Sequence, residues 1–333
     1  MRVLVLGGTH HVGRAAVEAA LAAGDDVTTV NRGVSRPPAD GVRPLVADRT
    51  TAGALASALD GQPDWDAVVD TWSGAPRAVH ESARLLSGRA AHYAYVSSRS
   101  VYRWPIPPGL DESAPVADGD PDSDVTADYQ AAKRGAELAV LDGFDGPSLL
   151  ARAGLVIGPY EITGRLPWWL GRLAEGGPTL APGPYDRPLQ YIDGRDLAIW
   201  LLSTAQRGVT GPFNAVSHRG HATMGTLLDA AVDASGGTAE LVWVDPEVVD
   251  DAGIAAWTEL PIWLPPTGEA AGLHDGDVTA AYAAGLDCRP VTDTVRDTWA
   301  WLQAEGWPPP RPDRPPVGLD RAREDAVLAS VRR

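Results

Sequence analysis

Cysteine, lysine and long apolar runs are scarce or missing in this sequence of 333 residues. Cys288 is the only cysteine, so no internal disulfide can form, and we expect a reducing, cytoplasmic environment. The sequence contains no run of about 18 apolar residues, and its apolar opening is too short for a signal peptide. We therefore predict neither a transmembrane helix nor a secretory leader.

Positive charge is also in short supply, because 44 acidic residues outweigh 28 basic ones and the formal net charge is −16. This balance argues against nucleic acid and against anionic membranes as partners. No internal repeat is found and no metal site is predicted. We expect the partner to be a small-molecule substrate.

A strand, a glycine-rich turn and a helix are predicted at the N-terminus. Residues 2–6 are a short apolar run, Gly7 and Gly13 bound the turn, and residues 12–23 place small and apolar side chains at helical spacing. Such a turn directs backbone N–H groups and the positive end of a helix dipole at an anion, here a dinucleotide pyrophosphate. His10 occupies the position of the usual middle glycine. On this motif alone, a simple packing turn remains an alternative.

Strands and helices alternate through the first half of the chain. Further strands are predicted at residues 27–31, 43–47, 66–71 and 92–97, and helices at residues 51–60 and 76–87. This alternation predicts an α/β fold with a doubly wound parallel sheet that is covered on both faces.

The end of the second predicted strand bears on the choice of cofactor, because it meets the adenosine ribose in such folds. Asn31 and Arg32 stand there in place of an acidic residue. A guanidinium suits a phosphate, so we predict NADP(H), with NAD as the alternative and His10 as a possible aid. Arg32 as a solvated loop residue is the competing interpretation. Asp48, after the third strand, is a candidate for an adenine contact or for a loop cap.

Two later segments contain the residues for proton transfer. Ser98 and Ser100 follow the fifth strand, where active sites of open α/β sheets gather. Tyr129 and Lys133 are four residues apart, on one face of a predicted helix. A nearby ammonium stabilises a phenolate, so the tyrosine can exchange a proton while a hydride moves to or from a nicotinamide. Lys133 is the only lysine in the chain, which weakens the interpretation of this pair as a chance surface motif.

These motifs together resemble the extended short-chain dehydrogenase/reductases, in the NAD-dependent epimerase/dehydratase-like group. The resemblance rests on Gly7-Gly8-Thr9-x-x-Val12-Gly13, Tyr95-Val96-Ser97-Ser98-x-Ser100-Val101-Tyr102 and Tyr129-x-x-x-Lys133. Without the middle glycine and with Asn-Arg-Gly after the second strand, the chain is most similar to an atypical branch.

The resemblance implies a Rossmann-type domain with a smaller, interleaved C-terminal lobe that binds substrate. We place the dinucleotide domain at residues 1–160, completed by segments from about 189–216, the lobe at 161–307, and a proline-rich linker and tail at 308–333. A monomer or homodimer is expected. The implied catalytic set is Ser98, Tyr129 and Lys133, with Lys133 also holding the nicotinamide ribose. The pyrophosphate would lie among Gly7, Thr9, Val12 and Gly13.

Departures from the family pattern narrow the function. Arg99 and Ser100 replace the Asp-Glu pair of sugar-nucleotide dehydratases, and Ala153 replaces the proline after Arg152. Arg187 is a candidate for binding a diphosphate, against an ion pair with a carboxylate such as Asp193. Ser100 and Trp168 are candidates for substrate contacts, although tryptophans in the lobe also fit a structural core. We interpret residues 176–188 as a loop.

Three functions remain open at this point. The first is an NADP(H)-dependent ketone, aldehyde or alcohol oxidoreductase acting on a small metabolite. The second is a nucleotide-sugar epimerase with tightly bound NAD. The third is a non-catalytic relative that senses a cofactor or binds RNA.

Overall fold

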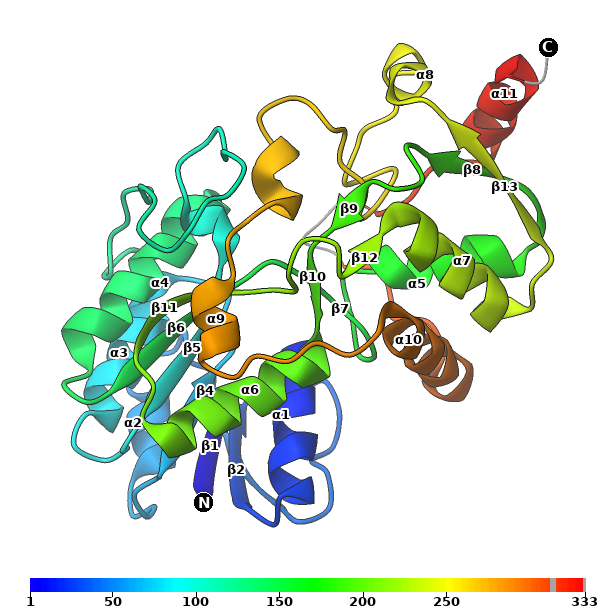
Figure 1. The fold of residues 1–333 in the computed structure, drawn as a ribbon. Helices are drawn as coiled ribbons and strands as arrows, with labels where there is room; N and C mark the ends of the chain where they lie inside the picture. Colours follow the sequence, from blue (N-terminus) through cyan, green and yellow to red (C-terminus); the bar gives the residue numbers. More distant parts are fainter. Residues whose placement is uncertain (312–315, 332–333) are drawn as a thin grey trace.

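The computed structural model describes residues 1–311 and 316–331 (Figure 1). A seven-stranded parallel sheet lies at its centre, in the order β11-β6-β5-β4-β1-β2-β3. Its strands are β1 (Arg2–Leu6), β2 (Asp26–Asn31), β3 (Val42–Val46), β4 (Ala67–Asp70), β5 (Tyr93–Ser98), β6 (Ser148–Ala153) and β11 (Gly211–Ala215). Strand order reverses at β1, between β2 and β4, so the ligand crevice is expected at the carboxyl ends there. The predicted fold class is confirmed.

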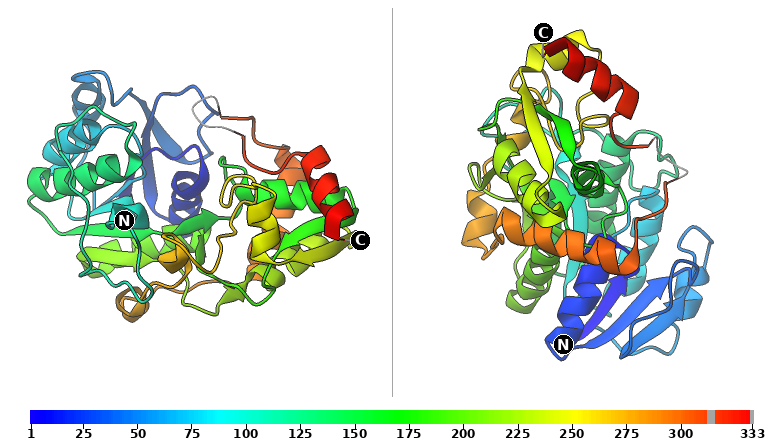
Figure 2. Two further views of the ribbon diagram at one scale, coloured as in Figure 1. Left: turned by 90° about the horizontal axis from the view of Figure 1, so that it is seen from above. Right: turned by 90° about the vertical axis from the view of Figure 1, so that its right-hand side faces the viewer.

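Helices cover both faces of this sheet (Figures 1 and 2). One face carries α1 (His11–Ala22), α6 (Gly194–Arg207) and α9 (Thr279–Ala283); the other carries α2 (Ala54–Leu59), α3 (Pro76–Leu86) and α4 (Tyr129–Gly143). Along β1, Val3 and Val5 pack toward the first group, while Leu4 and Leu6 pack toward the second. Both sides of the strand are buried, which explains its continuous apolar run.

A second lobe has its own apolar core, which includes the buried Trp169 and Trp263. Its elements are β7 (Leu155–Ile157), α5 (Arg165–Ala174), β8 (Gly177–Pro182), β9 (Pro188–Leu189), β10 (Tyr191–Asp193), β12 (Ala222–Thr223), α7 (Met224–Ser235), β13 (Ala239–Val244), α8 (Pro246–Asp251), α10 (Val291–Glu305) and α11 (Arg321–Val331). Two 3-10 turns, η1 (Arg99–Val101) and η2 (Ala271–His274), lie outside these elements. The lobe is interleaved with the sheet domain, because α6, β11 and α9 come from the second half of the chain and pack on the first.

One expectation for the second half, the loop at residues 176–188, differs from the structure. Residues 176–188 are not simply a loop, because β8 pairs in parallel with β13. Of the segment at 189–216, only β11 joins the main sheet, while β10 pairs with β7. These pairings join strands far apart in sequence, and no local pattern marks them.

The C-terminal segment is docked, whereas the sequence suggested a peripheral tail. Glu324 of α11 is 2% exposed and accepts hydrogen bonds from Arg172 Nε at 2.7 Å and from the Leu180 amide at 2.9 Å. Of the predicted linker at 308–316, residues 312–315 lie outside the described residues. In the described part of the chain, every helix is too short or too polar to cross a bilayer.

Candidate active site

The glycine turn between β1 and α1 is closed tightly against the neighbouring strand. Gly7 has φ +129°, and a Cβ there would collide with Thr71 Oγ1. A Cβ on Gly13 would lie 2.7 Å from the Gly8 nitrogen. His10 is the N-cap residue of α1, yet its side chain makes no capping hydrogen bond. The His11 N–H donates to the Tyr160 carbonyl at 3.1 Å, so among the described residues the next N–H groups, those of Val12 and Gly13, are left to a ligand. This cradle fits a dinucleotide pyrophosphate.

The other residues predicted for the turn occupy consistent places. Thr9 is half-buried within the turn, and Val12 is buried in the core beneath α1. Val12 is therefore available to a ligand only through its backbone. The roles of both residues at the pyrophosphate remain predictions.

The end of β2 is folded over this turn by Asn31. Its Nδ2 donates to the Gly7 carbonyl at 3.3 Å, and its Oδ1 accepts from the Gly33 amide at 2.8 Å. Arg32, between them, is exposed and forms no hydrogen bond or ion pair within the described residues. Partial desolvation, reinforced by the charge of Arg36, lowers the pKa of His10. His10 therefore lies close to Arg36, on the side of the turn where the adenosine ribose is expected.

Asp48 has the geometry of a loop cap. Its Oδ1 accepts from the Thr50 amide at 2.9 Å and from the Thr50 hydroxyl at 2.7 Å. These hydrogen bonds lower the pKa of the carboxyl group, so it remains an anion. An adenine contact for Asp48 stays a prediction.

Lys133 is buried at the carboxyl ends of β4 and β5. Its Nζ donates to the carbonyls of Trp72 and Val96, both at 2.9 Å, and to the Tyr95 hydroxyl at 3.1 Å. Burial lowers the pKa of this ammonium from 10.5 to about 8. Nothing in the local sequence indicated that Tyr95 and Trp72 would hold the lysine, because neither lies on its helix.

Tyr129 stands at the start of α4, one turn from Lys133 on the same face. Asp128 caps the helix by accepting from the Ala131 amide at 3.0 Å, and Gln130 Nε2 donates to the Tyr102 carbonyl at 2.6 Å. Tyr129 is 41% exposed, and its hydroxyl has no partner among the described residues. The hydroxyl is therefore open to a substrate oxygen.

Ser98 and Ser100 meet across η1, beside the start of α4. Ser98 Oγ accepts from the Ser100 amide and donates to Ser100 Oγ, both at 3.1 Å. The Gln130 contact ties α4 to the segment after η1, so the structure brings Ser98, Ser100, Tyr129 and Lys133 to one edge of the sheet. Within the described chain, Tyr129 and Lys133 form no direct hydrogen bond. The catalytic role of the set remains a prediction.

Arg99, directly after Ser98, is a buried cation. From the sequence it was noted only as the replacement of an acidic residue found in dehydratases. It is 1% exposed and donates to Gln190 Oε1 at 3.1 Å and to the Leu273 carbonyl at 2.8 Å. Burial lowers its pKa to about 10. These contacts tie the end of β5 to η2.

Arg187 and Trp168 lie among structural contacts. Arg187 donates to the carbonyls of Leu264 and Pro265, at 3.2 and 3.1 Å, whereas Asp193 pairs with Arg195 at 2.7 Å. The ion pair between Arg187 and Asp193 is therefore not formed. Trp168 packs edge-on against Trp169 and touches Gly318. Substrate contacts by either residue stay predictions.

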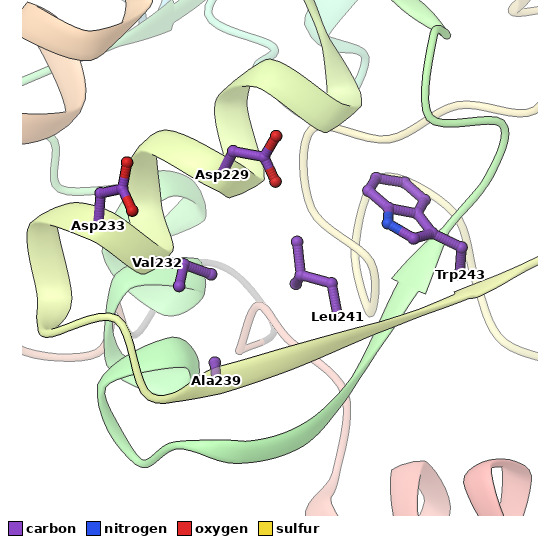
Figure 3. A pocket seen from close by; sticks show the side chains of 6 residues that line it. All are labelled: Asp229, Val232, Asp233, Ala239, Leu241 and Trp243. Atoms are coloured by element: carbon purple, nitrogen blue, oxygen red, sulfur yellow. The ribbon is translucent and has the colours of Figure 1, made fainter.

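A hollow lies elsewhere, in the second lobe. It has a volume of about 440 Å³ and is open to solvent between α7 and β13 (Figure 3). Its lining residues are Asp229, Val232, Asp233, Ala239, Leu241 and Trp243. None of these belongs to the predicted site, and the hollow contains none of the proton-transfer residues.

A parallel sheet of this order, with a glycine turn at its switch point and a serine, tyrosine and lysine at its edge, defines an enzyme of the extended short-chain dehydrogenase/reductase type. Residues 3–215 match the NAD dependent epimerase/dehydratase family, and the chain belongs to that family. This confirms the resemblance on which the sequence analysis relied. No curated protein sequence matches the chain significantly.

Solved structures show the same fold at low sequence identity. WbmH of Bordetella bronchiseptica, in complex with NAD+, is 16% identical, with a TM-score of 0.67, over 92% of this chain and 99% of its own. WbmG of the same organism, in complex with NAD and UDP, is 20% identical, with a TM-score of 0.65, over 92% and 96%. The UDP-glucose 4-epimerase of Thermus thermophilus, in complex with NAD, is 18% identical, with a TM-score of 0.63, over 92% and 100%. Each of these neighbours is in complex with NAD or NAD+, which supports a nicotinamide dinucleotide as the cofactor, and at these identities the likeness shows a shared fold.

Proposed function

We propose that this protein reversibly oxidises a carbinol carbon of a nucleotide-linked sugar and returns the hydride to the opposite face, as an epimerase does. The observation that carries the proposal is the meeting of Ser98, Tyr129 and Lys133 at the sheet edge beside the Gly7–Gly13 cradle. The substrate class is supported by the neighbours whose structures hold NAD with UDP, or NAD in a UDP-glucose 4-epimerase.

The residues of this chain would divide the proton chemistry among them. Tyr129 accepts the hydroxyl proton of the substrate as the carbon–oxygen double bond forms, and it gives the proton back on reduction. The positive charge of Lys133 favours the phenolate that Tyr129 must become. Ser98 donates a hydrogen bond to the same substrate oxygen. When bound, the nicotinamide ring takes up and releases the hydride.

Water elimination is not part of this proposal. Arg99 stands where a dehydratase has a carboxylic acid, and its guanidinium is committed to Gln190 and Leu273. Arg152 is likewise committed, because it pairs with the buried Glu137 at 2.9 Å. A guanidinium does not release its proton in a protein, so neither arginine can serve as the acid that a β-elimination needs.

A second candidate is the NADP(H)-dependent reductase, which one observation favours. No acidic residue ends β2, and the exposed Arg32 stands there instead. A non-catalytic or RNA-binding role receives no support, since the family and its neighbours are enzymes.

Release of the resident nucleotide tests these two functions against each other. The purified protein is denatured, and the supernatant is analysed by mass spectrometry; the native protein is assayed with UDP-sugars alone and with ketones plus NADPH. Bound NAD together with interconversion of UDP-sugars, without added cofactor, is the expected result. Stoichiometric NADPH consumption with a ketone, and no bound NAD, would replace the epimerase by the reductase. Turnover by Tyr129→Phe equal to that of the wild type would contradict both mechanisms.

A further inference from the structure

A carboxylate from the second lobe binds two arginines beside the predicted dinucleotide site. Glu305, the last residue of α10, accepts from Arg14 Nη1 at 2.8 Å and from Arg14 Nη2 at 2.6 Å, a bidentate pair. Arg36 Nη2 donates to Glu305 Oε2 at 3.1 Å. One carboxylate therefore neutralises much of the charge of two guanidiniums, with α10 passing beside α1 (Figures 1 and 2).

The two arginines belong to the elements that frame the adenosine ribose. Arg14 lies in the first turn of α1, directly after Gly13, and Arg36 lies in the loop that follows β2. The hydrogen bonds of Asn31 hold the start of that loop over Gly7. The charges of both arginines contribute to the lowered pKa of His10. In folds of this type, an arginine at this place receives the adenosine 2′-phosphate.

Glu305 is the last residue of α10, where the negative end of the helix dipole disfavours a carboxylate. The carboxyl end of a helix dipole repels an anion, so a glutamate at the last position of α10 needs compensation. Arg14 supplies most of this compensation and Arg36 a smaller part; the hydrogen bonds from Arg14 are the main cause that lowers the pKa of the carboxyl group to about 2. Arg14 is fixed further by Glu18, at 2.9 Å, and by the ring of Tyr160, 3.6 Å below its guanidinium carbon.

We propose that Glu305 is a cofactor-specificity residue, which occupies Arg14 and Arg36 as an internal anion and so excludes the 2′-phosphate of NADP in favour of NAD. The proposal rests on the dinucleotide site of the proposed function. It explains how a chain with arginines around this edge uses the cofactor seen in its structural neighbours. A 2′-phosphate has to displace the carboxylate, whereas the 2′-hydroxyl of NAD does not.

Calorimetric titration of the full-length protein, first freed of any resident nucleotide, with NAD+ and with NADP+ tests the proposal. In Glu305→Gln we expect NADP+ to bind about tenfold more tightly, the worth of one charge-assisted contact, and NAD+ to change by less than about twofold. Side-chain exposure of Glu305 is 36%, so the variant removes no core packing. Asp293→Asn is the matched control, because it removes the same charge from the same helix. Within the described residues, the Asp293 carboxylate forms an ion pair with Arg296 alone. The variant should change the affinity for neither nucleotide.

A double-mutant cycle locates the effect. Arg36→Ala should cost little NADP+ affinity in the wild type, but in the Glu305→Gln background it should remove most of the gain. The gain should also shrink as salt is raised. Equal changes for both nucleotides, or no change for NADP+, would overturn the specificity role while leaving the dinucleotide site intact. Failure of the wild type to bind either nucleotide would overturn the proposed function itself, and this inference with it.

Discussion

The Lys133 ammonium lies 3.1 Å from the Tyr95 hydroxyl and 4.8 Å from the centre of the Tyr95 ring. The tyrosine belongs to β5 and the lysine to α4, so this contact fixes α4 against the sheet. The Tyr95 hydroxyl donates in turn to the Trp72 carbonyl at 3.1 Å. Burial of this group raises the pKa of Tyr95 well above its usual value, so it remains a neutral partner of the ammonium.

The only lysine of the chain should titrate near neutrality. Labelling lysine with carbon-13 at the ε position gives a single side-chain resonance, and we expect it to report a pKa of about 8. Because folding lowers this pKa from 10.5, the unfolded chain binds more protons between pH 8 and pH 10.5. The contribution of Lys133 to the free energy of unfolding therefore rises with pH across that window and is least favourable below it.

Lys133→Met provides the control for this linkage. The difference in unfolding free energy between the wild type and the variant should change over the same window and be flat below it. A resonance that titrates at the ordinary lysine value, with a constant difference between the two proteins, would show that Lys133 is not desolvated.

Removing the Tyr129 hydroxyl should abolish proton transfer without emptying the cofactor site. We expect Tyr129→Phe to lower kcat by about 10²–10⁴-fold, the usual worth of a general acid–base group. Nucleotide affinity should be unchanged, because the Gly7–Gly13 cradle is untouched. Tyr185→Phe is the matched control, since that tyrosine is exposed on the second lobe and bonds Asp229. A similar loss of kcat in both variants would argue against a specific role for Tyr129.

Gly7→Ala should damage the turn through two separable effects. The new Cβ collides with Thr71 Oγ1, and φ +129° is strained for any other residue, so we expect a loss of about 3 kcal/mol in urea unfolding. Gly24→Ala has φ +77° but nothing within 4 Å, so its loss should be about 1 kcal/mol. Equal losses of unfolding free energy in the two variants would mean that the close approach of Thr71 to Gly7 does not contribute to the cost of the substitution.

The docked C-terminal helix depends on a buried ion pair. Glu324→Ala leaves the buried Arg172 with only the distant, exposed carboxylate of Glu175, at 3.9 Å, and we expect a loss of about 3 kcal/mol of unfolding free energy. Asp325→Ala, one residue further and exposed, should change stability by no more than about 0.5 kcal/mol. If both variants behave alike in thermal unfolding, α11 contributes little to the stability of the lobe.

The sheet domain could be predicted because its signals are local. The apolar run of β1, the glycines of the turn and the helical spacing of α1 lie within one stretch, and each strand buried on both faces shows the same pattern. Ser98, Tyr129 and Lys133 could be proposed together for a related reason, since strand ends of one parallel sheet meet at one edge. The start of α7 is likewise set locally, because Thr223 forms a capping box with Thr226, three residues on.

What the sequence alone determined, then, is the dinucleotide fold and the set of residues for proton transfer. The tertiary structure decided the rest. It brought β8 beside β13, Glu324 beneath Arg172, Tyr95 onto Lys133 and Glu305 onto Arg14, pairs that lie from 38 to 291 residues apart. No local periodicity encodes such pairs, because their geometry arises only when separate elements pack. The sequence therefore showed Arg32 near the adenosine edge, and only the tertiary structure showed that Arg14 and Arg36 lie there too and that the Glu305 carboxylate binds both.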